Sequence, residues 1–481
     1  MCVSTPAGQV GACGVSRPVG GCHPGKGGPH VKRRDLLKAA STVGVGAVAI
    51  GTLPRWTQAV SGGADEHVDV LVIGGGTAGT IAAIQAARAG ARTLLVEAGS
   101  QLGGTMTTGG VAAPGLFHAW GKQVITGIGW DLIIHALALD GGTMPDFSQV
   151  PQSHSHHQVH INGPIYAALA EEAALKEGVI LAYYELPGGV TQTDGGWEVE
   201  TVGKGLRRRI SCRQLIDCTG GADVVGMIGL PRLRETESQP GTLMFSFGNY
   251  DTHQLDAELI QQRYRQALAS GGLRPGDFQH AEGQFINFLR CGGTNAQHVF
   301  GADSSTSVTR TVANVAGRAS MLRLLRFIRS LPGCEDARLL RMQTETAVRE
   351  TYRIVGEVQI TVEDYTSGRL FEDAIGYSFY PIDLHDHSGV KPQPLSPGVV
   401  PTIPLRALVP RGSRNLLVAG RSVSSDRLAN SALRVQASCM AMGQAAGAAA
   451  ALASQSGTTP LSVPFNELTA LLRKHGATVP G

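Results

Sequence analysis

Two short segments of this chain carry residue types suited to acid–base chemistry and anion binding. The motif YPIDLH supplies Tyr380, Asp383 and His385, and the motif RETYRI supplies Arg349 and Arg353. A histidine is a natural proton acceptor when a hydride leaves a C–H or C–OH group. An arginine can hold a carboxylate or an enolate-like oxygen. These five residues are the candidate catalytic set.

The same residues have a structural interpretation. Asp383 and the two arginines could form a buried ion-pair network, and His385 could be a core histidine whose ring nitrogens are both satisfied. The sequence leaves both interpretations open.

A glycine-rich turn marks a second candidate site. The branched residues Val70–Ile73 predict a buried strand, and Gly74, Gly76 and Gly79 follow in the spacing G-x-G-x-x-G before an alanine-rich helix. Such glycines allow a tight turn, close approach of the backbone to a pyrophosphate, and close helix–strand packing. The pyrophosphate would lie at the N-terminus of the helix, where free N–H groups favour an anion.

An acidic residue completes this unit. Residues 92–97 predict the second strand, which ends at Glu97, about 20 residues after the glycines, where a carboxylate takes the ribose hydroxyls. A glycine-rich turn in some other α/β protein would leave Glu97 without a role. The pattern therefore predicts a dinucleotide site.

Length and composition suggest a dinucleotide domain with a second domain. The chain has 481 residues and a net charge of +3, and this length is long for one domain. Its 64 glycines are nearly double the ordinary usage of about 7%. Outside the N-terminal segment the main basic run is Arg207–Arg209, which predicts a solvated hairpin face, so we expect no nucleic-acid binding.

The eight cysteines contain no C-x-x-C motif, which disfavours a dithiol redox centre and a clustered thiolate metal site. A histidine cluster, His154, His156, His157 and His160, lacks carboxylates or cysteines at a ligand spacing. We therefore expect a polar loop before a helix opened by Asn162 and Pro164, with no metal bound. A role for one of these histidines in holding substrate stays open.

The N-terminal segment, residues 1–61, predicts a disordered start followed by a twin-arginine signal peptide. Arg33 and Arg34 precede an apolar run, residues 39–53, that is shorter than the 18 or more residues of a membrane span. We expect export of folded, cofactor-loaded protein by the twin-arginine translocation machinery to the periplasm or the extracellular space. A buried helix after chance arginines and an uncleaved anchor are the alternatives.

The remaining chain predicts an α/β protein with a discontinuous nucleotide domain. Its first part is 66–222, including an excursion at 112–185, and its return segment with a closing helix is 401–481. Residues 223–400 predict an inserted second domain, with a strand at 242–247 and helices at 256–269 and 308–331. Within the nucleotide domain we expect a hairpin strand at 207–211, a strand at 215–217, a final strand near 415–421, and one small-residue helix at about 431–453.

Several motifs in these segments resemble the FAD-dependent oxidoreductase family related to the flavoprotein subunits of succinate dehydrogenase and fumarate reductase. The resemblance covers about residues 68–476. It rests on VIGGGTAG, GKQVITGI, RETYRIVGE, YPIDLH, and NLLVAGR followed by SALRVQASCMAMGQAAG. In two places the chain departs from the family pattern: Cys218 stands where alanine is more usual, and 154–162 matches nothing specific.

The resemblance implies a GR2-type Rossmann-like FAD-binding domain with a discontinuous α+β substrate domain, and FAD as the cofactor. By position, the residues that would contact FAD are Gly74, Gly76, Gly79, Glu97, Gly103, Gly104, Thr105, Val190, Thr219, Gly220, Gly420, Arg421 and Arg434. Val190 is included because a strand near it usually supplies backbone contacts to adenine. Thr219 and Gly220 could instead be an ordinary strand-end turn.

Arg434 has a specific expected role. Reduced flavin carries negative charge near N1 and the C2 carbonyl, and a helix starting near 431–434 would direct N–H groups there, with Arg434 adding a charge. A stabilisation of about 2 kcal/mol corresponds to roughly 40 mV for a two-electron couple. An ordinary surface arginine is the alternative.

The leading prediction is an exported flavoenzyme that oxidises or reduces a small organic substrate through flavin N5 and an electron acceptor that the sequence does not identify. The alternatives are a flavin-binding electron carrier or structural subunit without turnover, and an NAD(P)-linked dehydrogenase. The single glycine fingerprint disfavours the dehydrogenase. His118 lies in the region of a covalent flavin link, but we expect releasable FAD.

Overall fold

The computed structural model describes residues 65–148, 154–280, 282–390 and 392–481. The chain divides into two units, Met1–Gln58 and Ala59–Gly481, and the described residues belong to the second. The predicted export signal at 1–61 lies outside the described residues and stays a prediction. Across the described ranges, no helix combines the length and the apolar character needed to cross a membrane.

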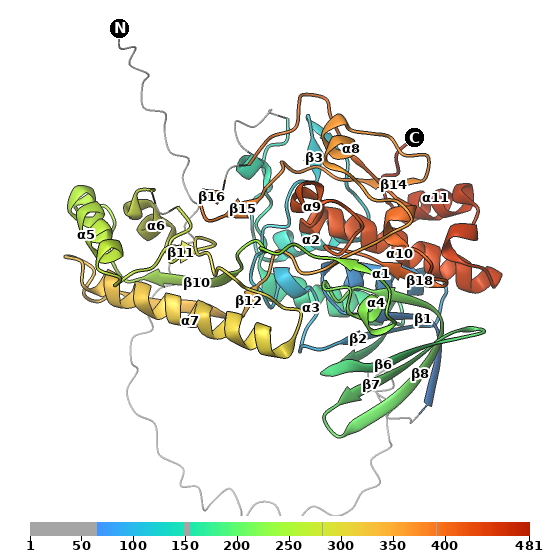
Figure 1. Cartoon of the computed structure of the whole chain (residues 1–481). Coiled ribbons are helices and arrows are strands. Elements are labelled where there is room, and N and C mark those ends of the chain that lie inside the picture. Colours follow the sequence, from blue (N-terminus) through green and yellow to red (C-terminus); the bar gives the residue numbers. More distant parts are fainter. Residues whose placement is uncertain (1–64, 149–153, 281, 391) are drawn as a thin grey trace, which may run out of the picture. The chain divides into compact units, whose positions relative to one another are not determined.

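The central sheet of this mixed α/β fold contains five parallel strands, which adjoin in the order β5-β2-β1-β8-β18 (Figure 1). Their residues are mostly buried and branched, as expected where helices cover a parallel sheet. Their bounds are β5 (Ile180–Tyr183), β2 (Thr93–Glu97), β1 (Asp65–Ile73), β8 (Leu206–Asp217) and β18 (Leu416–Val418).

The carboxyl ends of β1, β8 and β18 lie at one edge of the sheet. Ile73 is paired with Asp217, and Asp217 is paired with Val418. The loops that follow these strands therefore begin side by side, at the edge where open α/β sheets bind ligands.

An antiparallel meander extends the same sheet through β8. β7 (Gly196–Gly203) pairs with β8, and β6 (Glu185–Thr193) pairs with β7. The predicted break between a hairpin strand at 207–211 and a later strand at 215–217 is wrong, because β8 is continuous. Its residues alternate between exposed and buried along the meander, and the last four are all buried in the parallel part. β8 thus belongs to both the parallel part of the sheet and the antiparallel meander.

Two helices pack against each other on the parallel sheet. α1 (Thr77–Arg88) and α10 (Gln436–Ser456) approach so closely that a Cβ on Gly443 would lie 2.2 Å from the Ala78 carbonyl oxygen. A Cβ on Gly447 would lie 2.3 Å from the carbonyl oxygen of Ala82. These glycines bring the C-terminal segment directly onto the helix that follows the glycine-rich turn. Other helices that contribute to this core include α2 (Ile128–Leu139), α3 (Gly163–Lys176) and α11 (Phe465–Lys474).

The predicted single helix at 431–453 is wrong. The structure has α9 (Arg427–Leu433) and then α10, with Arg434 and Val435 between them. Val435 is extended (ψ 150°), because the N–H of Ala437 donates to the carbonyl of Pro114 (2.8 Å) and draws the chain aside. The side chain of Asp426 caps α9 by accepting from the N–H of Ala429 (2.8 Å).

A second sheet, in the order β11-β10-β12, carries its own aromatic core. Figure 1 shows α7 lying along β10 and β12. Predicted elements at 242–247, 256–269 and 308–331 are confirmed within two residues. The domain boundaries at 222/223 and 400/401 stay predictions. The bounds are β10 (Thr242–Gly248), β11 (Gly293–Thr294), β12 (Arg338–Ala347), α5 (Ala257–Ala269), α6 (Phe285–Cys291) and α7 (Ser307–Arg329).

Short elements complete the described chain. They are η2 (Gly104–Met106), β3 (His118–Ala119), β4 (Lys122–Gln123), η3 (His154–His157), α4 (Asp223–Met227), β9 (Arg232–Leu233), β13 (Arg353–Ile354), α8 (Val362–Ser367), β14 (Ala374–Tyr377), β15 (His385–Asp386), β16 (Gly389–Val390), β17 (Thr402–Pro404), η4 (Leu405–Leu408) and η5 (Pro460–Ser462). The expected cap of α3 is confirmed, since the Asn162 side chain accepts from the Ile165 N–H (3.3 Å). Of the five cysteines described, Cys291 is exposed and the others are buried.

Candidate functional site

In the glycine-rich turn after β1, the packing of the fold requires glycine at two positions but not at a third. A Cβ on Gly74 (φ +100°) would lie 2.5 Å from the Cys218 carbonyl oxygen, and one on Gly79 would lie 1.8 Å from the Gly74 carbonyl oxygen. A Cβ on Gly76 would meet nothing within 4 Å. The space above Gly76 is therefore bare backbone that a ligand can approach.

The first turn of α1 begins at this bare backbone. Gly76 is the N-cap, no side chain caps the helix, and the first turn holds no acidic residue. The first N–H groups of a helix lack intrahelical partners and carry a partial positive charge. This helix end therefore suits an anion such as a pyrophosphate.

Glu97 holds the turn from the end of β2. Its carboxylate accepts from the N–H of Gly75 (2.7 Å) and from the N–H of Gly99 (2.6 Å). Burial raises the pKa of Glu97, and these two hydrogen bonds act in the opposite direction. The predicted position of Glu97 beside the turn is confirmed, whereas its contact with a ribose stays a prediction.

A second loop lies directly on the turn. The N–H of Gly103 donates to the Gly75 carbonyl (2.8 Å), and a Cβ on Gly104 would lie 2.9 Å from the Gly76 Cα. Thr105 follows in η2. The three residues predicted from the LGGT motif thus border the bare backbone at Gly76.

The C-terminal segment returns to the same place. A Cβ on Gly420 (φ +104°) would lie 3.3 Å from the Ala78 Cβ, and Arg421 Nε donates to the Gly220 carbonyl (2.7 Å). Thr219 lies next to Gly220, and its hydroxyl donates to Asp217 at the end of β8 (2.7 Å). We call this set of loops, 74–79, 97–105, 218–221 and 419–421, the cradle.

Val190 lies in β6 of the meander, outside the loops that form the cradle. It is paired with Val199 in the meander and packs against the core that contains Leu71. Its predicted contact with adenine stays a prediction.

Asp383, His385 and a third residue, His298, form a second cluster. His385 Nε2 is 3.1 Å from Asp383 Oδ2, and His385 Nδ1 is 2.9 Å from His298 Nε2. All three side chains are buried. In the part of the chain that the structure describes, no three or more His, Cys, Asp or Glu side chains are grouped so that they could hold a metal ion. Here the groups are hydrogen-bonded to one another in a row.

The charges around this row decide its protonation. Burial acts to raise the pKa of Asp383, but the hydrogen bond from His385 and the positive Arg434 outweigh it and lower this pKa to about 2. Burial lowers the pKa of His385 to about 4, although the bond to Asp383 opposes the change. Burial and the nearby charge of Arg349 lower the pKa of His298 to about 3. Near neutral pH the cluster therefore contains one carboxylate and two neutral imidazoles.

Arg434 lies over Asp383 at the junction between α9 and α10. One of its terminal nitrogens donates to the Asp383 carbonyl (3.2 Å) and is 3.7 Å from the carboxylate. Its Nε is buried and has no acceptor among the described residues. An unpaired buried donor costs free energy, so this atom fits an acceptor supplied by a bound group. Because α10 starts at Gln436, the predicted N-terminus of a helix at 431–434 is wrong, while Arg434 itself is close to the row.

Tyr380 and Arg349 border the same cluster. The Tyr380 hydroxyl accepts from Gln158 (3.0 Å), and its ring meets His154 edge-on with centroids 5.2 Å apart. Burial raises the pKa of Tyr380 well above its usual range. Lost hydration and the neighbouring Arg434 lower the pKa of Arg349 to about 9. Four of the five predicted catalytic residues are thus gathered here.

Arg353 is engaged in a different contact. It forms an ion pair with Glu235 and donates through Nε to the Ser425 carbonyl (3.0 Å). Only 5% of its side chain is exposed, against 37% for Glu235. The interpretation of the arginines as a structural ion pair therefore fits the contacts of Arg353, and its catalytic role stays a prediction.

This asymmetry gives a test. We expect Glu235→Gln to lower the thermal midpoint more than Arg353→Met, because it leaves a buried cation unpaired, at a cost of up to about 3 kcal/mol. Arg353→Met leaves a carboxylate that water can reach, and it should keep the rate of cofactor reduction per bound cofactor. Thermal unfolding and stopped-flow absorbance check both expectations. A large loss of rate in Arg353→Met would place this residue in the active site after all.

Sequence reasoning missed two residues of this cluster, His298 and Gln239, and kept the role of His154 open. The Gln239 side chain accepts from the His385 backbone N–H (3.1 Å). None of the three belongs to a recognisable motif. Only the folded chain brings His298 to His385, across 87 positions.

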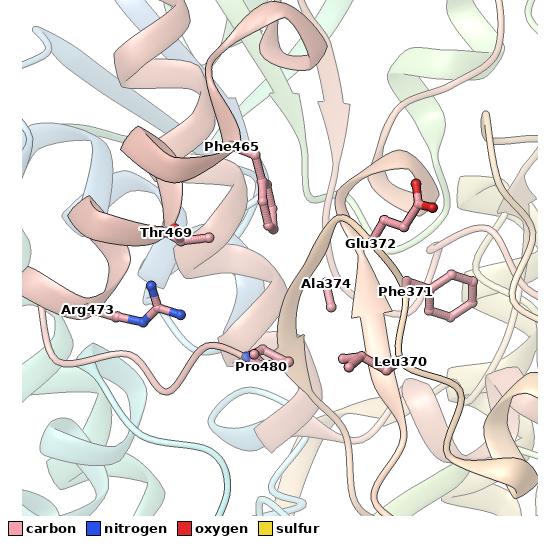
Figure 2. Close-up of a pocket in the computed structure, with 9 residues that line it drawn as sticks. Leu370, Phe371, Glu372, Ala374, Phe465, Thr469, Arg473 and Pro480 are labelled. Atoms are coloured by element: carbon pink, nitrogen blue, oxygen red, sulfur yellow. The ribbon is translucent and has the colours of Figure 1, made fainter.

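Two surface cavities lie away from the cradle and the cluster. One cavity, of about 430 Å³, lies between α11 and the segment 370–374 (Figure 2). Phe465 and Thr469 line it from α11, and Leu370 and Glu372 line it from the other side. The other, about 1000 Å³, lies beside the meander turn and the end of α10. Neither is lined by a predicted site residue, so the chemistry is assigned to the cradle and the cluster.

Comparison with known families agrees with the cradle. The sequence profile of a family described as FAD dependent oxidoreductase matches residues 69–472. This range contains every predicted cofactor-contacting and catalytic residue. No curated protein sequence matches the chain significantly.

Three solved structures are distantly similar to this chain. A geranylgeranyl bacteriochlorophyll reductase-like protein from Thermoplasma acidophilum is 14% identical over 85% of this chain and 82% of that chain, with a TM-score of 0.39. The p-nitrophenol 4-monooxygenase of Pseudomonas putida DLL-E4 is 12% identical over 85% and 84%, with a TM-score of 0.37. An anhydrotetracycline hydroxylase from Streptomyces rimosus is 16% identical over 40% of this chain, with a TM-score of 0.30, and the match spans 41% of that hydroxylase.

Proposed function

Because the chain belongs to the FAD-dependent oxidoreductase family, we propose that this enzyme transfers a hydride between a small organic substrate and N5 of FAD. The observation that carries the proposal is the uncapped start of α1 at Gly76, where a Cβ would meet nothing within 4 Å and the loops from β2, β8 and β18 converge. FAD supplies the two-electron chemistry.

The residues of the cradle fit this cofactor. The N-terminus of α1 would hold the pyrophosphate, and Glu97 would face the ribose. The unpaired Nε of Arg434 would donate to the flavin near N1 and the C2 carbonyl, where negative charge develops on reduction. Arg349 and Arg434 would hold an anionic group of the substrate, such as a carboxylate or an enolate-like oxygen.

The finer fold assignment is part of the proposal. A GR2-type nucleotide domain, related to the succinate dehydrogenase and fumarate reductase flavoproteins, is supported by the glycine-rich turn, the meander that leads into β8, and the return of the chain through β18. We propose 66–222 and 401–481 as its two parts and 223–400 as the substrate domain.

Export is proposed from the sequence. The motif Lys32-Arg33-Arg34 before a short apolar run supports transport of the folded, FAD-loaded enzyme by the twin-arginine machinery to the periplasm or beyond. We expect replacement of Arg33 and Arg34 by lysine to hold the protein in the cytoplasm, as cell fractionation would show. Unchanged export of that variant would contradict the proposal.

Two measurements test the catalytic proposal. We expect the purified protein to be yellow and to release FAD into the supernatant on acid precipitation, because the cradle offers non-covalent contacts. Anaerobic addition of small hydroxy- and carboxylic acids should then bleach the visible flavin absorbance. Bound FAD that no substrate or reductant of this class bleaches would favour a flavin-binding subunit without turnover.

A further inference from the structure

The row of Asp383, His385 and His298 has a defined direction. The two imidazole rings have centroids 5.1 Å apart and planes inclined by 62°. His385 uses one ring nitrogen toward Asp383 and the other toward His298. Each of these two hydrogen bonds contains one proton. Once the donor of one bond is known, the donor of the next follows.

The carboxylate fixes the first position. Asp383 lies beside the guanidinium of Arg434 and within range of Arg349, so it is ionised and can only accept. His385 must therefore donate through Nε2–H. The Nδ1 of neutral His385 is then an acceptor, and His298 must donate to it through Nε2–H. Neutral His298 is left with a lone pair on Nδ1, which has no partner among the described residues.

This assignment changes which group can act as the base. A proton acceptor needs a free lone pair within reach of the proton it takes. Both nitrogens of His385 are already engaged inside the protein, so His385 could accept only by breaking one of these bonds. The low pKa of His298 supports its being neutral, and therefore able to accept, at ordinary pH.

We propose that His298 exchanges the proton with the substrate, and that His385 and Asp383 are positioning residues that set its tautomer and take over its positive charge. This inference rests on the proposed function. It reassigns the acid–base role from His385, where the sequence motif placed it, to a residue outside any motif.

The proton and electron balance is simple for oxidation of an alcohol. The O–H bond breaks and its proton forms an N–H bond at Nδ1 of His298, while the C–H bond breaks and its hydrogen leaves with two electrons to FAD. The Nε2 proton of His298 then passes to Nδ1 of His385. The positive charge ends on the imidazole bonded to Asp383, where a carboxylate stabilises it. Reduction of a carbonyl runs the same path backwards.

Other charges face this row and bear on its titration. Arg349, His280 and Asp386 act on His298, and Arg349 and Arg434 act on His385. The cationic groups oppose protonation of the row, while Asp383 favours protonation of His385 and Asp386 favours protonation of His298. The rate in the oxidative direction should therefore fall as the pH drops far enough to protonate His298 in advance.

A spectroscopic readout tests the proton assignment without turnover. In holoenzyme labelled with ¹⁵N-histidine, His298 and His385 should each show a protonated Nε2 and an unprotonated Nδ1 near neutral pH. His298→Gln and His385→Gln assign the two signals, and His253→Gln, an exposed position, is the control. A protonated Nδ1 on His298 would overturn the proposal. The wild-type spectrum gives the proton positions, and the variants serve only to assign its signals.

Kinetics separate the two histidines. Per bound FAD, His298→Gln should reduce flavin about 10²–10⁴-fold more slowly and lose the acid limb of the pH profile. His385→Gln should keep part of the rate and shift that limb. A wild-type rate in His298→Gln at every pH, with His385→Gln inactive, would return the role to His385. Wild-type flavin that no substrate reduces would refute the proposed function, and the nitrogen spectrum would still decide the proton positions.

Discussion

A Gly76→Ala variant is expected to fold as the wild type does and to lose most of its FAD. The backbone of Gly76 (φ −66°, ψ −171°) is a conformation that alanine adopts freely, and its Cβ would meet no protein atom within 4 Å. That empty space is where the cradle would hold the pyrophosphate. Overpacking by a methyl group costs about 1–3 kcal/mol, so binding should weaken by roughly ten- to a hundredfold.

The measurement is the ratio of flavin to protein absorbance after purification, followed by titration of the apoprotein with FAD. Gly195→Ala is the matched control, because its added Cβ also meets nothing within 4 Å but lies in a meander turn. Gly79→Ala provides the contrast: its Cβ would collide with the Gly74 carbonyl, so the fold itself should suffer. Full FAD binding by Gly76→Ala would place the pyrophosphate elsewhere.

An Asp383→Asn variant is expected to keep FAD and to lose flavin reduction by about 10²–10⁴-fold. The amide removes the charge that fixes the His385 tautomer and leaves Arg434 without its carboxylate partner. The cradle contains no atom of Asp383, so cofactor content should be preserved. Anaerobic stopped-flow measurement of flavin bleaching, normalised to bound FAD, gives the rate.

Asp277→Asn is the control for this loss. Asp277 is also a buried carboxylate paired with an arginine, Arg323 of α7 (2.6 Å), but it lies in the loop between α5 and α6. Its substitution should lower the thermal midpoint and leave the rate per bound FAD unchanged. Equal losses of rate in both variants would mean that the effect of Asp383→Asn is only structural.

The cradle could be predicted from the sequence because its main signal is local. Gly74, Gly76, Gly79 and Glu97 belong to one strand–turn–helix–strand unit, and their spacing alone matches the fingerprint of a dinucleotide site. The family motifs extended this signal to Gly220 and Arg421, which the structure joins by a hydrogen bond.

The acid–base cluster could be predicted only in part. YPIDLH placed Asp383 and His385 two residues apart, and the structure bonds them. The contact of His385 with His298 depends on how two distant segments pack, and no periodicity or motif encodes it. The ion pair of Arg353 with Glu235, which lies 118 positions away, could not be predicted for the same reason, and the catalytic role of Arg353 stays a prediction.

Tertiary contacts limited how well helix and strand ends could be predicted. The break at Arg434 and Val435 depends on the N–H of Ala437 donating to the carbonyl of Pro114, roughly 320 positions earlier. Small residues on both sides favour one continuous helix, and this distant carbonyl overrides that preference.

The glycine contacts between α1 and α10 constrain when the enzyme can acquire its cofactor. The first turn of α1 is backed by Gly443, and the cradle is closed by Gly420 and Arg421, all near the opposite end of the chain. At about 5–20 residues per second of synthesis, the ribosome needs on the order of tens of seconds to make the segment between them. A nascent chain that lacks the C-terminal segment therefore lacks part of the cradle, and we expect flavin to bind only after synthesis is complete.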